Sequence, residues 1–176
     1  YPLSEKYHIL LPHIMGFGDH TDRIFKTEEC VRELAEYIRT LNKKVMLVGF
    51  SLGAQLAFKL VSEYEELFEA AIIVSPWLIK KEEPLLSRVE EQSIRQLKQM
   101  KNRFTCGLIG LINGLPSKQR KEFVFQMGRV REETVRNVVY NGITLEGTLA
   151  FNGVTIPMVA LAGEIEQAEV RDSGKR

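Results

Sequence analysis

The sequence of 176 residues lacks the features that mark several large classes of protein. It contains no uninterrupted apolar run of about eighteen residues, so no membrane-spanning helix is expected. Its 24 basic and 23 acidic side chains leave a net charge of +1, which argues against a nucleic acid or another polyanion as partner. No basic leader followed by an apolar segment is recognisable, and a cytoplasmic protein is therefore expected.

Cysteine and histidine are also scarce. The two cysteines, Cys30 and Cys106, are too few for a disulfide framework, and Cys30 is expected to be a buried, reduced thiol. All three histidines, His8, His13 and His20, lie at the start of the chain. A Gly-x-Gly turn at 16–18 lacks the third glycine of a phosphate loop, and no cofactor or metal site is expected.

The most informative stretch runs from residue 44 to residue 61. An apolar, β-branched run at 45–48 predicts a buried strand, and good helix formers follow from Ala54. Between them lies Gly49-Phe-Ser51-Leu-Gly53. A serine in such a turn needs a cramped backbone, and the two glycines are expected to remove Cβ atoms that would collide there. The following helix directs free N–H groups at a developing oxyanion.

This strand, Gly-x-Ser-x-Gly turn and helix resemble the nucleophile elbow of the α/β-hydrolase superfamily. The resemblance implies that Ser51 is the nucleophile and that the backbone N–H of Leu52 is one oxyanion donor. In that superfamily the catalytic acid follows a later strand, which here corresponds to the apolar run at 154–162. The family pattern selects Glu166, three residues past Gly163, with Glu164 as the alternative.

The remaining apolar runs predict a mostly parallel α/β sheet flanked by helices. Residues 7–12 and 70–75 are expected to form strands, each buried on both faces like the other strands of the chain. A helix is expected to begin at Thr27 with its hydroxyl as the cap, and to bury an apolar stripe from Cys30 to Leu41.

Between the runs at 70–75 and 154–162 the pattern is helical. Helices are expected at 85–100, from Ser117 onward and at 132–140, while 108–112 is an apolar patch broken by glycines. An insertion at this point resembles the helical cap of many α/β-hydrolases. The resemblance gives a domain organisation of core (1–77), cap (78–153) and core (154–176). The excess of basic residues in the cap is interpreted as a solvated helix surface in preference to a site for an anionic substrate.

The chain departs from the family pattern in two places. No histidine follows Ser51, and the strand whose loop usually gives the second oxyanion donor would lie before Tyr1. We therefore expect an internal fragment of the fold. Either the strand at Ile9 pairs anew with that at Val45, or a slot of about 10 Å stays unfilled between them. The strand at Val159 should form a bare apolar edge.

The predicted function is that of a serine-dependent acyl hydrolase, similar to a carboxylesterase, acting on a small-molecule acyl or ester substrate. The chain alone should be inactive, because no histidine follows Ser51 to act as the catalytic base. The alternative is a catalytically inactive hydrolase-like protein used for binding or interaction.

Overall fold

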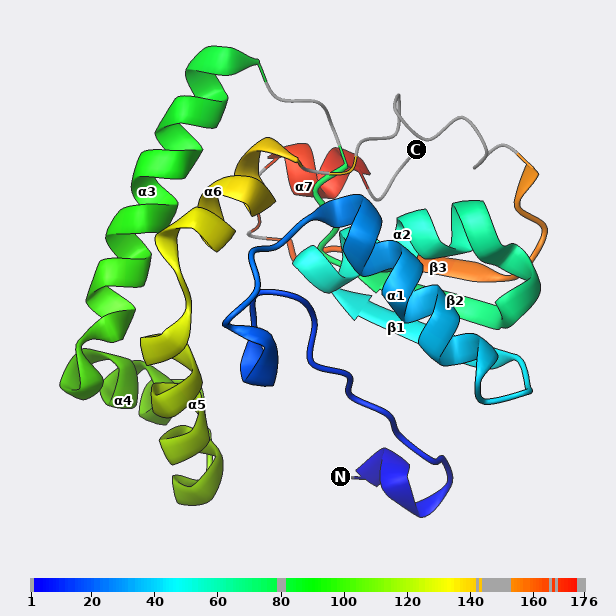
Figure 1. Ribbon diagram of the computed structural model, residues 1–176, viewed down its shortest axis with the longest axis horizontal. Helices are drawn as coiled ribbons and strands as arrows, with labels where there is room; N and C mark the ends of the chain where they lie inside the picture. The colour runs from blue at the N-terminus through cyan, green and yellow to red at the C-terminus, as the bar shows by residue number, and fades with distance from the viewer. Residues whose placement is uncertain are drawn as a thin grey trace.

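A three-stranded parallel sheet forms the centre of the protein. The computed structural model describes residues 2–78, 82–141, 143, 153–164, 166 and 168–173. Strands β1 (Val45–Phe50), β2 (Phe68–Val74) and β3 (Met158–Leu161) lie in the order β1–β2–β3 (Figure 1). The sheet is parallel throughout and its strands alternate with helices, which confirms the predicted α/β class.

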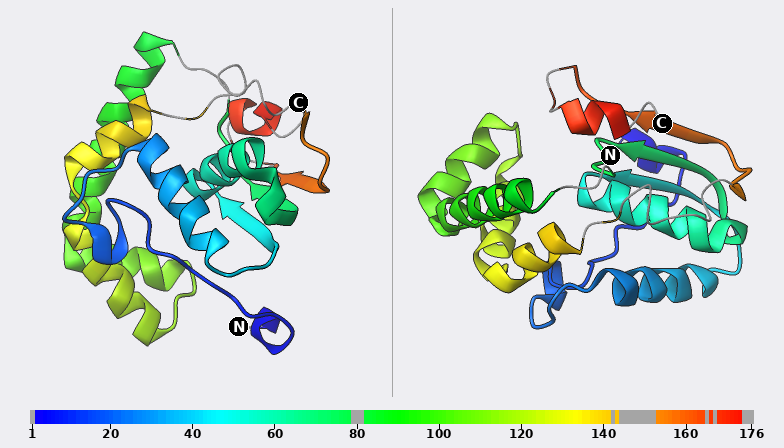
Figure 2. Two further views of the ribbon diagram at one scale, coloured as in Figure 1. Left: turned by 45° about the vertical axis from the view of Figure 1, so that its right-hand side comes forward. Right: turned by 90° about the horizontal axis from the view of Figure 1, so that it is seen from above.

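Two helices cover one face of this sheet (Figure 2). Helix α2 (Leu52–Tyr64) packs against β1 and β2, and α1 (Thr27–Arg39) packs against α2. A short 3-10 helix, η3 (Glu65–Leu67), leads from α2 into β2. The stripe predicted for α1 is buried as expected, since Cys30, Val31, Ala35 and Ile38 all belong to the core.

The described part of the chain between β2 and β3 contains four helices: α3 (Glu83–Lys101), α4 (Arg103–Ile112), α5 (Ser117–Arg129) and α6 (Glu132–Tyr140). They lie beside the sheet and are called here the helical segment (Figure 1). Helix α7 (Ala168–Ser173) follows β3. None of the described helices is both long and apolar enough to cross a membrane.

Helix α4 differs from the glycine-broken patch that the sequence predicts. The side chain of Asn102 caps it, because its Oδ1 accepts hydrogen bonds from the N–H groups of Phe104 and Thr105 at 3.0 and 3.1 Å. Gly110 is buried against α5, where an added Cβ would lie 3.1 Å from Cγ of Arg120. This glycine allows close helix packing and does not end the helix.

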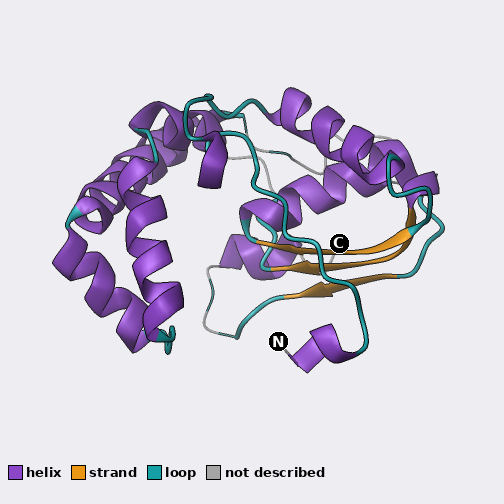
Figure 3. Cartoon of the chain, turned by 60° about the horizontal axis from the view of Figure 1, so that its bottom comes forward, coloured by secondary structure: helices purple, strands orange, loops and turns teal. Residues whose placement is uncertain are grey.

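The strand predicted at 7–12 is absent. These residues are exposed and without regular structure, between the 3-10 helices η1 (Pro2–Glu5) and η2 (Gly18–His20). Strand β1 stands at one edge of the sheet, and no described strand pairs with its outer side (Figure 3). Neither of the two expected outcomes is observed, because residues 7–12 form no strand that could pair with β1 or stand across a slot from it. Without an intervening strand, this segment has no ladder of backbone groups to join.

The prediction that every strand is buried on both faces is wrong. Met46, Val48 and Phe50 of β1 are 53%, 63% and 68% exposed. Val159 and Leu161 of β3 are also about half exposed. Strand β3 ends the described sheet, so it forms the apolar edge that the sequence predicts. Helices α1 and α2 cover only the opposite face, and the described residues leave these side chains in solvent.

Candidate active site

Ser51 lies between the end of β1 and the start of α2, with φ 52° and ψ −114°. A positive φ is strained for a residue with a side chain. Hydrogen bonds hold the backbone on both sides: Ser51 N–H donates to the Val74 carbonyl at 2.9 Å, and its own carbonyl accepts from Ala54 N–H at 2.9 Å. The turn therefore has the cramped geometry that the sequence predicts for a nucleophile elbow.

The two glycines of the turn differ in what they do. A Cβ on Gly49 would lie 2.2 Å from the carbonyl oxygen of Gly53 and 2.8 Å from the Cα of Ala54. The first turn of α2 therefore crosses directly over Gly49, where only glycine fits. A Cβ on Gly53 would meet no atom within 4 Å, and this glycine has no positive φ. The expectation that both glycines prevent a collision is thus correct for Gly49 alone.

Leu52 is the first residue of α2, so its backbone N–H has no partner inside the helix. The positive end of the helix dipole lies at the same place. These are the properties required of an oxyanion donor. Its role stays a prediction.

A second strained serine follows β2. Ser75 has φ 54°, and its N–H donates to the Leu161 carbonyl at 2.7 Å. Because Phe50 pairs with Val74, Ser75 and Ser51 lie side by side at the carboxyl edge of the sheet. The sequence does not signal this geometry, since a residue before proline is expected to be extended.

The proposed acid loop leaves β3 at the same edge. The Glu166 carboxylate accepts a hydrogen bond from Gly163 N–H at 2.8 Å, and Glu166 N–H donates to the Gly163 carbonyl at 3.3 Å. Glu166 is partly buried, whereas Glu164 is exposed and its carbonyl accepts from Arg171 at 3.3 Å. The second carboxylate oxygen of Glu166 retains capacity for a further donor. Neither glutamate is thereby tested as the catalytic acid.

The histidines are engaged elsewhere. His13 Nδ1 accepts from the backbone N–H of Asp19 at 3.2 Å, and its ring packs against Gly18. His8 and His20 are exposed. No hydrogen bond among the described residues joins a histidine to Ser51. Within the part of the chain that the structure describes, no group of three His, Cys, Asp or Glu side chains is placed to hold a metal ion.

Ser51 itself is exposed, and two shallow clefts lie away from it. The larger, of about 450 Å³, is lined by mostly charged residues of α3 together with Arg136 of α6. Its charges neutralise one another: Arg136 pairs with Glu90, and Arg95 pairs with Glu91. Neither Ser51 nor Leu52 lines either cleft.

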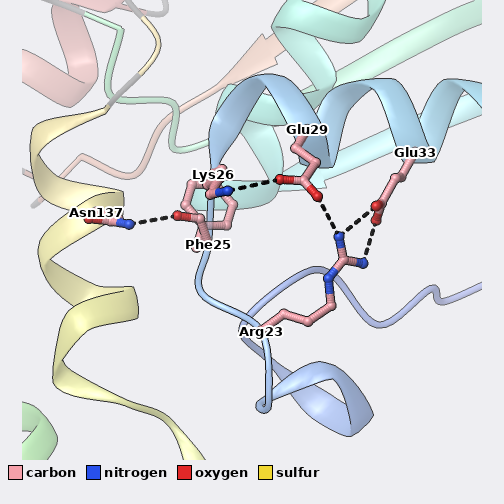
Figure 4. Close-up of polar contacts among 6 residues, drawn as sticks. All are labelled: Arg23, Phe25, Lys26, Glu29, Glu33 and Asn137. Atoms are coloured by element: carbon pink, nitrogen blue, oxygen red, sulfur yellow. Dashed lines mark hydrogen bonds and ion pairs between the residues drawn. The ribbon is translucent and has the colours of Figure 1, made fainter.

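An ion-pair network fixes the loop that precedes α1 (Figure 4). The Arg23 guanidinium donates to Glu33 at 2.6 and 2.8 Å and to Glu29 at 2.9 Å. The hydrogen bonds from Arg23 lower the pKa of Glu33. The same contacts, led by the bond to Glu33, raise the pKa of Arg23 above its ordinary value. Local spacing gave no signal for this network because Arg23 lies outside the helix.

Two further hydrogen bonds join this region to α6. Asn137 donates to the Phe25 carbonyl at 2.9 Å, as Figure 4 shows. The Thr27 hydroxyl donates to the Asn141 carbonyl at 2.7 Å. Thr27 is therefore not the expected cap, since Lys26 occupies the N-cap position and Thr27 ties α1 to the helical segment.

Both cysteines are free and buried. Burial raises the pKa of the Cys30 and Cys106 thiols, which keeps them protonated and unreactive at neutral pH. The expectation of a buried, reduced Cys30 is confirmed.

Comparison with known proteins places this geometry in context. A family model described as alpha/beta hydrolase fold matches residues 1–106. A membrane phospholipase A superposes with a TM-score of 0.71 at 14% identity, over 99% of this chain and 60% of its own. An N-formylmaleamic acid deformylase from Pseudomonas putida gives a TM-score of 0.62 at 15% identity, over 91% of this chain and 67% of its own.

An E-2-(acetamidomethylene)succinate hydrolase gives a TM-score of 0.59 at 16% identity, over 93% of this chain and 65% of its own. At these identities the likeness concerns the fold alone. The chain thus spans between 60% and 67% of the length of these three structures. A search with the sequence finds no match among curated proteins.

Proposed function

Because this chain belongs to the α/β-hydrolase fold family, we propose that it carries the nucleophile of a serine-dependent acyl hydrolase. The substrate is a small-molecule carboxylester or a related acyl compound. The backbone of Ser51 is the observation that carries the proposal. Its strained φ, its place between a parallel strand and a helix, and the close crossing over Gly49 are the mechanical requirements of a nucleophile elbow.

In the proposed reaction the Ser51 Oγ attacks the acyl carbon while a base accepts the hydroxyl proton. The carbonyl oxygen then carries the negative charge of the tetrahedral intermediate, and the Leu52 N–H donates to it. The base returns its proton to the leaving alcohol as the acyl-enzyme forms. Water repeats the sequence on the acyl-enzyme and releases the acid.

The proposal assigns the base to a histidine outside these 176 residues. No histidine follows Ser51 in the sequence, and the similar structures are longer than this chain. Glu166 would accept the ring N–H of that histidine, with Glu164 as the alternative. We further propose that the helical segment acts as a cap over the sheet edge, so that residues 78–153 separate two parts of the core at 1–77 and 154–176.

The names of the similar structures support hydrolysis as the class of reaction, since they describe a phospholipase, a deformylase and a hydrolase. Their substrates differ, and the fold alone does not select among them. The observation that favours a serine mechanism is specific to this chain. It is the strained residue at position 51, which carries a hydroxyl.

A fluorophosphonate probe tests the proposal in the full-length protein that contains this chain. An activated serine displaces fluoride from phosphorus and forms a stable Oγ–P bond, which peptide mass spectrometry locates. We expect the label on Ser51 and its loss in Ser51→Ala, with Ser75→Ala labelled like the wild type. A folded full-length protein that leaves Ser51 unlabelled would instead support the inactive binding protein.

A further inference from the structure

One helix of the helical segment presents large apolar side chains to solvent. Phe104, Leu108, Leu111 and Ile112 of α4 are between 47% and 81% exposed. Their spacing of four, three and one residues places them on a single side of the helix. These four residues are called the α4 stripe.

The stripe is not the packing face of α4. Cys106 and Gly110, on the other side of the helix, are buried. A Cβ on Gly110 would contact Arg120 and Phe123 of α5. A Cβ on Gly107 would contact Val124 of the same helix. The helix thus already buries one side against α5, and the stripe points away from it.

Helices α4 and α5 together are strongly basic. From residue 101 to 129, all of which the structure describes, there are six Lys or Arg and a single acidic residue, Glu122. The net charge of the whole chain is only +1, so the hairpin of helices α4 and α5 (residues 101–129) concentrates positive charge. Five of these side chains form no ion pair with any described acidic residue, whereas Arg129 pairs with Asp19 and Lys98 nearby pairs with Glu132. The five are Lys101, Arg103, Lys118, Arg120 and Lys121.

The hairpin also occupies an accessible position. Helices α4 and α5 lie together at one end of the helical segment, to the side of the sheet (Figure 1). Nothing among the described residues covers the α4 stripe there.

We propose that the α4 stripe binds an anionic lipid bilayer surface, lying in the plane of the interface. An amphipathic helix with aromatic and aliphatic residues on one side enters the boundary between headgroups and acyl chains, and neighbouring Lys and Arg attract anionic headgroups. Ten residues of helix span about 15 Å, half of a hydrocarbon core of about 30 Å, so α4 lies on the membrane and does not cross it. A nucleic acid would satisfy the positive charge but would leave the stripe in water.

The test is flotation of the purified 176-residue chain with vesicles. One set contains phosphatidylcholine alone and the other adds about one third phosphatidylglycerol. We expect the chain to float with the anionic vesicles at least tenfold more than with the neutral ones. Added salt should weaken the binding because the charge attraction is screened.

Two pairs of variants locate the contact. Phe104→Ser with Ile112→Ser should reduce binding at least tenfold, while Val48→Ser, which removes another largely exposed apolar side chain, this one on the sheet, should not. Lys118→Glu with Lys121→Glu should abolish the preference for anionic vesicles, while the same change at the exposed pair Lys43 and Lys44 should leave it. Circular dichroism confirms that each variant is folded.

Three outcomes would overturn the proposal. The first is a wild-type chain that floats with neither kind of vesicle. The second is loss of binding in Val48→Ser with retention in the stripe variant, which would assign the contact to the sheet face. The third is concentration-dependent self-association, removed by the stripe variant, with no binding to vesicles. That result would identify a second copy of the chain as the occupant.

Discussion

A methyl group placed on Gly49 would lie 2.2 Å from the carbonyl oxygen of Gly53. The obstacle is helix backbone, which cannot rotate away as a flexible side chain would. Strand β1 and helix α2 therefore approach more closely than any other residue at position 49 permits. This approach sets the direction of the turn that carries Ser51.

The two glycines should consequently respond differently to alanine. Gly49→Ala should lower the free energy of unfolding by about 3 kcal/mol or more, because backbone atoms must move. Gly53→Ala should raise it by up to about 1 kcal/mol, since alanine is the better helix former and its methyl group meets nothing. Urea unfolding measures both. Equal destabilisation by the two variants would show that the turn packs differently.

Two buried threonines give a second pair of opposite expectations. The Thr134 hydroxyl is fully buried and has no hydrogen-bond partner among the described residues, so Thr134→Val should be neutral or stabilising by about 1 kcal/mol. The Thr27 hydroxyl donates to the Asn141 carbonyl, and Thr27→Val should destabilise by about 1–2 kcal/mol. Thermal unfolding distinguishes them. A large loss in Thr134→Val would mean that its hydroxyl has a partner.

Local pattern predicted the parts of the fold that depend on neighbouring residues. The strand at Val45, the turn at Ser51 and the helix at 132–140 follow from apolar periodicity and glycine spacing. The sequence wrongly predicts that Val48 is buried, because an apolar strand sequence does not show whether another element covers each face of the sheet. Thr27 was misassigned because its partner lies 114 residues away.

In the candidate site, too, the features set by neighbouring residues can be predicted from the sequence, whereas those set by distant residues cannot. The Gly-x-Ser-x-Gly turn is a local motif, so its cramped backbone can be predicted from residues 45–53. The left-handed backbone of Ser75 cannot, because it contradicts the preference of a residue before proline. The sequence does not predict helix α4, because glycines usually interrupt a helix, whereas Gly110 allows close contact with α5 later in the chain.

The Arg23–Glu33 pair should make stability depend on pH. Arg23 lowers the pKa of Glu33 in the folded state, so the pair stabilises the protein above the unfolded carboxyl pKa of about 4.3. That contribution is lost as the pH falls through the lower, folded value. Both side chains are at least one third exposed, and solvent therefore screens the pair. Its contribution to the melting temperature should be about 2 °C.

Glu33→Gln should therefore reduce the melting temperature at pH 7 and show less further loss between pH 5 and pH 3 than the wild type. Glu36→Gln is the matched control, since Glu36 is exposed on the same helix and forms no ion pair with a described residue. Differential scanning calorimetry across this range provides the comparison. If Glu36→Gln and Glu33→Gln behave alike, the network does not contribute.

The proposed acid is tested in the full-length protein. Glu166→Gln should leave the loop conformation unchanged but replace the carboxylate that accepts the histidine N–H by an amide, which favours the wrong tautomer. The kcat for ester hydrolysis should therefore fall by up to about 10⁴-fold. Glu164→Gln should leave kcat unchanged, because its side chain is exposed. If Glu164→Gln is the damaging change, the position of the acid is wrong by two residues. If neither change matters, the acid lies elsewhere.

The central claim is that Ser51 is an acyl nucleophile whose base lies outside these 176 residues. Hydrolysis of a p-nitrophenyl ester tests it most directly, measured for the full-length protein, its Ser51→Ala variant and the 176-residue chain. We expect turnover by the full-length protein alone, with a loss of about 10⁶-fold in Ser51→Ala. Robust turnover by the 176-residue chain that Ser51→Ala abolishes would contradict the account and identify His13 or His20 as the base.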